Sequence, residues 1–449
     1  MNSNDIYRLI NILVLGVVFL LIFSAFQTSS MFQTIVLKAA KMEPNSTFHG
    51  DGFISLAIIY ISFAFANFVA PIVVVWITPK YSMFAASIIY VLFIASFLKP
   101  MDWSLYLGSF LVGVAAAILW TAQGNFLSMN SNTETIGRNT TIFWSLFQSS
   151  LICGSIFQYV MFRNTISITT HQRTIFYASF TVVGSLGILL NFALRKPPSF
   201  LMKEIVSESD LTNIESEIYT PKEAFFQSFK LIKTRTILLL LFIFAYSGFE
   251  LTFFSGVYGT SVGQTEYFGD KAKGYVGLIG IMIGLGEITS SVLFNILPRI
   301  WKGCTPDLVI VVGLFTHIVG FYLTFLSLPF DSTQGPSNAS TYIIPRAELV
   351  IFCGYLLGFG DSIFNTQIMS LLGDVYKGVD SPSAFALFYF MKSLASGIAF
   401  FYSTILTMQW QLLILSITGI LGTLSFISIE RQTRLMIIER NINSTLIEE

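Results

Sequence analysis

Four ionisable side chains lie inside apolar stretches of the sequence, where a charge is costly. Glu250, Glu287, Asp361 and Lys392 are each flanked on both sides by residues of hydrocarbon character. A charged group at membrane depth has to face a partner or a water-filled cavity, because hydrocarbon does not solvate it. A carboxyl group in such a cavity can take up and release a proton as its access to water changes. These residue types therefore predict solute binding or proton coupling, with Glu250 and Glu287 as the first candidates for the proton.

Neutral polar side chains at similar depth extend this set of candidates. Asn365 lies in the second half of the chain, and Gln123 and Asn125 lie in an apolar stretch of the first half. An alternative interpretation pairs Lys392 with Asp361 or a glutamate as a buried ion pair that only braces the helices, since opposite charges neutralise each other. The sequence leaves both interpretations open.

Two short strings are typical of enzymes but lack the context that catalysis requires. Residues 358–361 read Gly-Phe-Gly-Asp, as in intramembrane aspartyl proteases, but the preceding apolar stretch has no second aspartate to share a proton. Residues 259–263 read Gly-Thr-Ser-Val-Gly, but a serine-hydrolase elbow needs a strand-to-helix turn. No phosphate-binding loop or metal-ligand spacing occurs, and His317 stands alone in its stretch, as an interhelical hydrogen-bond partner would. We therefore expect no enzyme activity, no cofactor and no bound metal.

Composition places these residues in a membrane protein. Of the 449 residues 54% are hydrophobic and 11% are charged, and the mean hydropathy is +0.71. A soluble domain would have about a quarter of its residues charged. Basic and acidic residues number 25 each, so no charge excess indicates a nucleic-acid partner. The partner that composition does predict is the lipid bilayer.

About twelve apolar stretches of roughly twenty residues follow one another, each long enough to cross a bilayer as a helix. The longest polar interval divides them six and six, which predicts an all-α polytopic fold of two six-helix bundles. We assign residues 1–194 to the first bundle, 195–235 to a cytosolic linker, 236–430 to the second bundle and 431–449 to a cytosolic tail. The predicted spans are Tyr7–Gln27, Phe53–Ile77, Ser82–Leu98, Ser104–Leu127, Thr141–Met161, Thr174–Leu194, Thr236–Thr260, Gly274–Leu297, Leu308–Leu328, Leu349–Leu372, Ala384–Thr407 and Leu412–Ile429.

Charge and glycosylation patterns predict the orientation of the chain. The linker carries seven Lys or Arg residues, which places it and both termini in the cytosol. The acceptor pattern Asn-x-Ser/Thr occurs at Asn45 and Asn338, which fall in predicted outside loops. Two further acceptors, Asn139 and Asn443, fall on the cytosolic side and should stay unmodified. Whether the membrane is the plasma membrane or an endomembrane stays open.

Six strings in the chain are long and distinctive: LVLGVVFLLIFSAFQTSS from Leu13, SLAIIY from Ser55, AAAILWTAQGN from Ala115, TIGRN from Thr135, ELTFFSGVYGT from Glu250 and GFGDSIFNTQ from Gly358. They resemble the Unc-93-like family of the major facilitator superfamily over nearly the whole length. The resemblance implies a twelve-helix fold with cytosolic termini. Members of that family are associated with regulation of a potassium channel complex or with escorting receptors through the secretory pathway.

The resemblance leaves two functions open, a secondary transporter of an unidentified small solute and a non-transporting accessory protein for a channel or receptor. The loop after the second span usually carries an acid and several bases that latch the cytosolic gate, but residues 76–81 read Trp-Ile-Thr-Pro-Lys-Tyr. The matching loop Pro298–Pro306 keeps Arg299 and Lys302 without an acid. The missing latch favours the accessory protein, whereas polar residues along the first, fourth, seventh and tenth spans favour the transporter.

Overall fold

The computed structural model describes residues 3–132, 135–195, 230–301, 303–376 and 380–448, and long helices make up nearly all of this part. The predicted all-α class is confirmed. In this described part eleven helices are long and apolar enough to cross a membrane, or twelve if one bent pair counts as a single span, so the chain is a multi-pass membrane protein. The helices are α1 (Ser3–Lys41), α2 (Gly52–Ala66), α3 (Ala70–Ile77), α4 (Pro79–Ser96), α5 (Asp102–Met129), α6 (Ile136–Phe162), α7 (Thr170–Leu190), α10 (Arg235–Thr252), α11 (Tyr258–Gln264), α12 (Ala272–Ile300), α13 (Pro306–Ser327), α14 (Ala347–Val375), α15 (Asp380–Ser403) and α16 (Met408–Glu448), with short turns η1 (Asn191–Ala193), η2 (Phe253–Val257) and η3 (Glu266–Lys271).

Two predicted spans of the first half differ clearly from the helices that form. The span predicted at Tyr7–Gln27 continues as α1 to Lys41, because the polar residues after position 27 are buried by other helices rather than exposed. The span predicted at Phe53–Ile77 is broken into α2 and α3, which meet at an angle of 72°. Pro71 has no N–H to donate to the carbonyl of Asn67 four residues earlier, so the helix cannot continue through this point.

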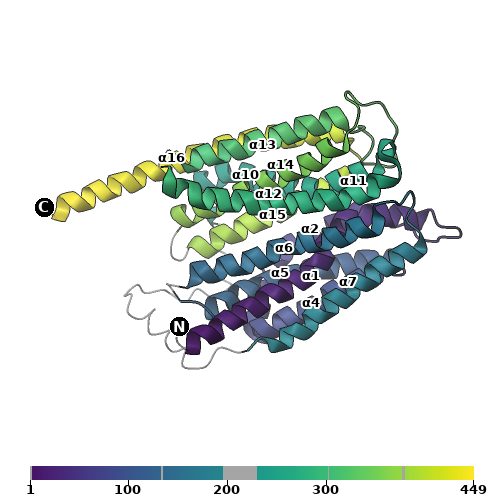
Figure 1. Cartoon of the computed structure of the whole chain (residues 1–449). Coiled ribbons are helices and arrows are strands. Elements are labelled where there is room, and N and C mark those ends of the chain that lie inside the picture. The colour runs from purple at the N-terminus through teal and green to yellow at the C-terminus, as the bar shows by residue number, and fades with distance from the viewer. Residues whose placement is uncertain (1–2, 133–134, 196–229, 302, 377–379, 449) are drawn as a thin grey trace.

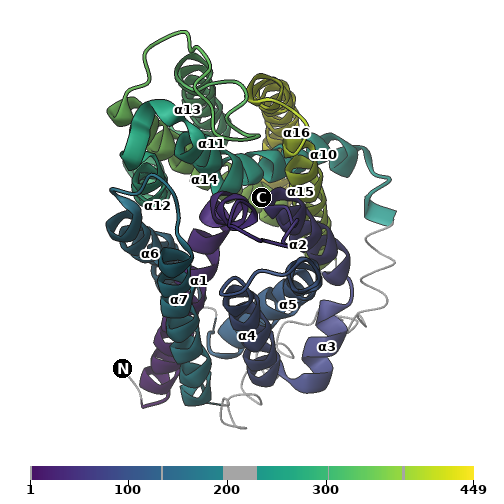
Figure 2. The ribbon, with the colours of Figure 1, turned by 90° about the vertical axis from the view of Figure 1, so that its right-hand side faces the viewer.

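The helices form two bundles that lie side by side, α1 to α7 in one and α10 to α16 in the other (Figures 1 and 2). Two helix pairs make the main contact between them: α2 packs on α15, and α6 packs on α12. Small residues allow the close approach, since a Cβ added at Gly284 of α12 would lie 2.6 Å from the Ile152 side chain of α6.

One glycine contact recurs in both bundles. Gly113 places α5 directly against the backbone of α2 at Ile59, and Gly358 places α14 against the backbone of α12 at Ile283. A Cβ atom at either glycine would collide with the facing carbonyl oxygen. The fourth crossing therefore packs on the second in one bundle as the tenth packs on the eighth in the other.

The two ends of the molecule differ. Both termini lie at one end, called here the termini end (Figure 1). At the opposite end, the loop end, the bundles are joined by polar contacts: Lys38 Nζ donates to the Gln334 carbonyl oxygen at 2.6 Å, and Thr165 N donates to the Asp270 carbonyl oxygen at 2.8 Å. Helix α1 also packs on α11 and η2 there, so the loop end is closed between the bundles.

The predicted linker, residues 195–235, lies largely outside the described residues, which include only Arg195 and residues 230–235 of it. The predicted tail, residues 431–449, begins within α16, which runs without a break to Glu448 and projects beyond the bundles (Figure 1).

Candidate functional site

Three polar side chains form a hydrogen-bonded chain between α14 and α15. Asn365 Nδ2 donates to Asp361 Oδ1 at 2.6 Å, and Lys392 Nζ donates to Asn365 Oδ1 at 2.6 Å. Asp361 is buried, whereas Asn365 and Lys392 are half-buried. The Asn365 amide thus accepts from the cation with its oxygen and donates to the acid with its nitrogen, so it links Lys392 to Asp361 without a direct ion pair between them. We call Asp361, Asn365 and Lys392 the amide bridge.

His317 of α13 lies beside this bridge and is fully buried. Its Nε2 is 3.0 Å from the Leu357 carbonyl oxygen, and its Nδ1 is 2.6 Å from the Tyr246 hydroxyl. A carbonyl oxygen only accepts, so Nε2 carries the hydrogen and Nδ1 accepts from Tyr246. Both nitrogens of a neutral imidazole are then satisfied. The prediction that His317 is an interhelical hydrogen-bond partner is confirmed.

Glu250 of α10 is buried beside the Asp361 carboxyl group. Its side chain is 1% exposed, and within the described ranges neither carboxylate oxygen has a hydrogen-bond partner. Oε1 lies 3.4 Å from His317 Nε2, but that hydrogen is directed to Leu357. The π-helical turn η2 starts three residues after Glu250, and such turns are frequent at functional sites.

Glu287 lies on the face of α12 that meets the other bundle. It follows Gly280 and Gly284 at helical spacing, and both glycines contact α6. The side chain is 5% exposed, and Oε2 has no hydrogen-bond partner among the residues described. Glu250, Glu287, Asp361 and Lys392 are close enough for their charges to interact. The structure therefore brings the four predicted ionisable residues and Asn365 together.

The first-half candidates lie elsewhere. Gln123 is buried and Asn125 is exposed on α5, whose main neighbours α2, α3, α4 and α6 all belong to the first bundle. Neither side chain makes a hydrogen bond to the second-half group in the part that the structure describes. In this arrangement the site is built almost wholly by the second bundle.

The two enzyme-like strings have packing explanations. Gly360 faces the imidazole of His317 so closely that a Cβ would overlap the ring. Ser261 lies within α11, where its fully buried hydroxyl donates to the Val257 carbonyl oxygen at 2.9 Å. This serine lies in a continuous helical segment and not at a strand-to-helix elbow, so it does not have the geometry of that motif's nucleophile.

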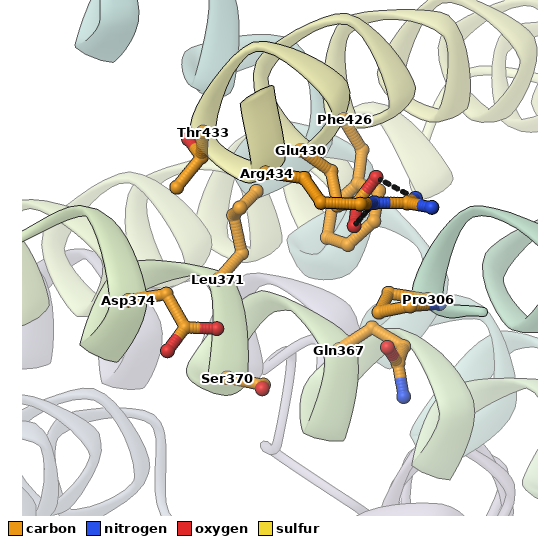
Figure 3. Close-up of a pocket in the computed structure, with 9 residues that line it drawn as sticks. All are labelled: Pro306, Gln367, Ser370, Leu371, Asp374, Phe426, Glu430, Thr433 and Arg434. Atoms are coloured by element: carbon orange, nitrogen blue, oxygen red, sulfur yellow. Dashed lines mark hydrogen bonds and ion pairs between the residues drawn. The ribbon is translucent and has the colours of Figure 1, made fainter. Parts of the chain in front are cut away.

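A charged cluster that sequence reasoning missed lies at the termini end. Asp307, the residue immediately after the acid-free loop Pro298–Pro306, pairs with Arg431 at 3.2 Å and with Arg434 at 3.1 Å. Arg434 also pairs with Glu430 at 2.6 Å (Figure 3). We call these four residues the α13–α16 clasp. Asp307 and its two arginines are more than 120 positions apart in sequence, so no local sequence pattern predicts their ion pairs.

A small cavity of about 100 Å³ adjoins the clasp between α14 and α16 (Figure 3).

The two acceptor asparagines of the predicted outside loops lie at the loop end and are exposed, Asn45 in the turn after α1 and Asn338 in the segment between α13 and α14. Asn139 is fully buried, and its Nδ2 donates to the Asn130 carbonyl oxygen and the Ser131 hydroxyl. Asn443 lies in α16 at the other end.

Comparison with known proteins places this architecture in a family. The family described as "Ion channel regulatory protein UNC-93" matches residues 43–427. UNC93-like protein MFSD11 of Xenopus laevis is 41% identical, over 95% of this chain and 97% of its own. UNC93-like protein 3 of Arabidopsis thaliana is 27% identical, over 90% of this chain and 82% of its own.

Solved structures show the same fold at low identity. The POT family transporter PepTSo has a TM-score of 0.64 at 10% identity and covers 95% of this chain and 98% of its own. FucP, a major facilitator superfamily transporter in the outward conformation, has a TM-score of 0.59 at 15% identity and covers 94% of this chain and 99% of its own. The predicted arrangement of a major facilitator fold is thereby confirmed.

Proposed function

Because the chain belongs to the UNC-93 family and has the major facilitator fold, we propose that it is a secondary transporter that couples the movement of a small solute to protons. The observation that carries this proposal is Glu250. It is buried beside an imidazole whose hydrogen is donated to the Leu357 carbonyl oxygen, and near a lysine that donates to Asn365.

An ionised carboxylate in this position would be costly. Several kcal/mol are needed to bury such a charge without a donor or counter-ion. Glu250 therefore holds a proton in this conformation and releases it when a change of conformation admits water. Proton coupling requires at least one buried acid that takes up a proton from one side of the membrane and releases it to the other.

The remaining candidates have separate roles in this proposal. The amide bridge and Glu287 bind the solute where the bundles meet, as in other transporters built from repeated halves. Gln123 and Asn125 would complete the site from the first bundle when the bundles change their relative orientation. The termini end, the linker and the α16 tail face the cytosol, in the plasma membrane or an endomembrane, and the loop end faces outside.

The experiment starts with a search for the solute. The purified full-length chain is screened in detergent against a metabolite library for compounds that raise its unfolding temperature, and each hit is tested for counterflow in proteoliposomes. An imposed pH gradient should then drive accumulation of the hit. Glu250→Gln keeps the shape but cannot titrate, so it should retain counterflow and lose accumulation. Glu266→Gln, at an exposed position of the loop end, is the matched control. Accumulation by Glu250→Gln at the wild-type level would refute the proposal.

The alternative of an accessory protein for a channel or receptor is supported by the description of the family as ion channel regulatory proteins. Affinity capture of the full chain from native membranes in mild detergent tests it. A channel or receptor recovered in a fixed ratio would favour this alternative, and recovery of chaperones alone would count against it.

A further inference from the structure

The acids of the site outnumber its cations. Among the described residues of the site there are three acids, Glu250, Glu287 and Asp361, and one cation, Lys392. His317 contributes no charge, because one of its nitrogens donates a hydrogen bond and the other accepts one, as in the neutral ring. The amide bridge joins Lys392 to Asp361, and the acids exceed the cations by two among the described residues of the site.

The groups packed around these acids do not supply positive charge to balance the excess of acids. Tyr246 on α10 and Tyr60 on α2 are neutral phenols, and α6, which meets the Glu287 face of α12, presents the neutral side chains of Ser155 and Ile152 and the Gln148 backbone carbonyl. The described residues therefore place two units of unbalanced negative charge at this depth whenever both glutamates ionise.

A second observation, apart from the acids, indicates an unfilled polar site. Ser247 is 1% exposed, and among the described side chains its hydroxyl has no hydrogen-bond partner. It lies three residues before Glu250 and therefore on the same face of α10. Buried polar groups are normally paired, so an unpaired hydroxyl beside an unpaired carboxyl is a place where a ligand group can bind.

Charge balance decides what that ligand is. With both glutamates ionised, an anionic solute would add a third negative charge and a neutral solute would leave both carboxylates uncompensated. A cationic solute replaces a proton one for one, so the total charge of the site stays constant through the exchange. Resting on the proposed function, we infer that the solute is a small organic cation, a protonated or quaternary amine, which binds at Glu287 in exchange for a proton.

Two features favour an organic cation over a metal ion. No group of three metal-ligating side chains is assembled in the part of the chain described. Aromatic rings instead lie beside Glu250: His317, 3.4 Å from this carboxyl group, packs on Phe364 at 5.4 Å and on Phe321 at 5.6 Å between ring centroids. Aromatic faces attract organic ammonium groups.

Matched probes of equal shape and different charge test this inference. Choline carries a fixed positive charge, 3,3-dimethylbutan-1-ol is its neutral carbon isostere, and 3,3-dimethylbutanoate is the corresponding anion. Tetramethylammonium and tetraethylammonium extend the size range. Binding to the purified full-length chain is measured by the shift in unfolding temperature and by calorimetry, and a pH dye in weakly buffered solution measures proton release.

We expect at least one of the quaternary amines to bind, with release of up to one proton, and the neutral and anionic isosteres not to bind. Proton and cation compete, so the affinity should rise as pH rises, by about tenfold per pH unit where one proton is exchanged. Glu287→Gln should weaken binding at least about tenfold, Glu287→Asp less, and Glu266→Gln not at all.

Two results would overturn the inference. The first is that none of the quaternary amines binds. The second is that the neutral or anionic isostere binds more tightly than the amines and that this binding is lost in Lys392→Ala rather than in Glu287→Gln. Neither result touches the proposed function, which fails only if the solute found in the library screen accumulates independently of Glu250. A Glu287→Gln chain that does not fold is replaced by Glu287→Asp, for which unchanged amine affinity and unchanged proton release would also count against the inference.

Discussion

The Glu250 carboxyl group lies 3.4 Å from His317 Nε2 and receives no hydrogen bond from it. The imidazole hydrogen is directed to a backbone carbonyl, and the ring is held in this tautomer by the Tyr246 hydroxyl on its other nitrogen. This histidine therefore positions the site without neutralising its acid, which leaves the acid available for a proton.

Removing the Tyr246 hydroxyl should loosen this arrangement. In Tyr246→Phe the buried Nδ1 of His317 loses its donor, and we expect a loss of about 1–2 kcal/mol in the free energy of unfolding, as for other unpaired buried groups. Reversible denaturation in mixed micelles measures it. Tyr322→Phe, at a side chain that is 60% exposed, is the control and should change stability little. Equal stability of the two variants would show that the hydroxyl does not hold the ring.

Two glycines of α14 allow a matched comparison. Gly360→Ala drives a methyl group into the His317 ring and should cost about 1–3 kcal/mol of stability through overpacking. Gly373→Ala, on the same helix with nothing within 4 Å of the added carbon, should be neutral or stabilising by up to about 1 kcal/mol. Both are read from unfolding midpoints in the same detergent. A Gly360→Ala chain as stable as Gly373→Ala would contradict the close contact.

The α13–α16 clasp should contribute modestly and in a salt-dependent way. Arg434 bonds two acids and its side chain is 40% exposed, whereas Arg431 bonds one and is 66% exposed. We expect Arg434→Gln to destabilise by about 1 kcal/mol or less, Arg431→Gln by less still, and added salt to shrink the difference. The opposite order of the two variants at low salt would argue against the clasp.

Cys304 gives a pH-dependent test of orientation. It lies between α12 and α13 at the termini end, and burial raises the pKa of its thiol. The thiolate is the reactive form, so labelling by a membrane-impermeant maleimide should be slow near neutrality and accelerate only above the ordinary thiol range. Labelling should require permeabilised cells and disappear in Cys304→Ser. Labelling in intact cells would place the termini end outside.

Glycan attachment tests the opposite end. Asn45 and Asn338 are exposed at the loop end, so Asn45→Gln and Asn338→Gln should each remove one glycan and increase mobility on a gel, with both losses in the double variant. Asn139→Gln should leave the mobility unchanged, because Asn139 is fully buried and its side-chain amide is hydrogen-bonded. Enzymatic deglycosylation supplies the reference band. A glycan lost on changing Asn139 would reverse the proposed orientation.

The sequence by itself determined the class of this protein and the residues that matter at membrane depth. Roughly twenty apolar residues in succession have one stable arrangement in a bilayer, because every backbone N–H and C=O group must be bonded within the segment. Ionisable residues within such segments are rare enough to be noticed singly, which is why Glu250, Glu287, Asp361 and Lys392 were predicted together.

Tertiary structure alone decided how these residues are paired. Three contacts depend on the rotation and depth of one helix against another. Asn365 lies between Lys392 and Asp361, Gly360 leaves space for the His317 ring, and Asp307 pairs with two arginines of α16. Those two quantities follow from side-chain packing between segments far apart in the chain, whereas the apolar pattern of each segment specifies only that it crosses the membrane.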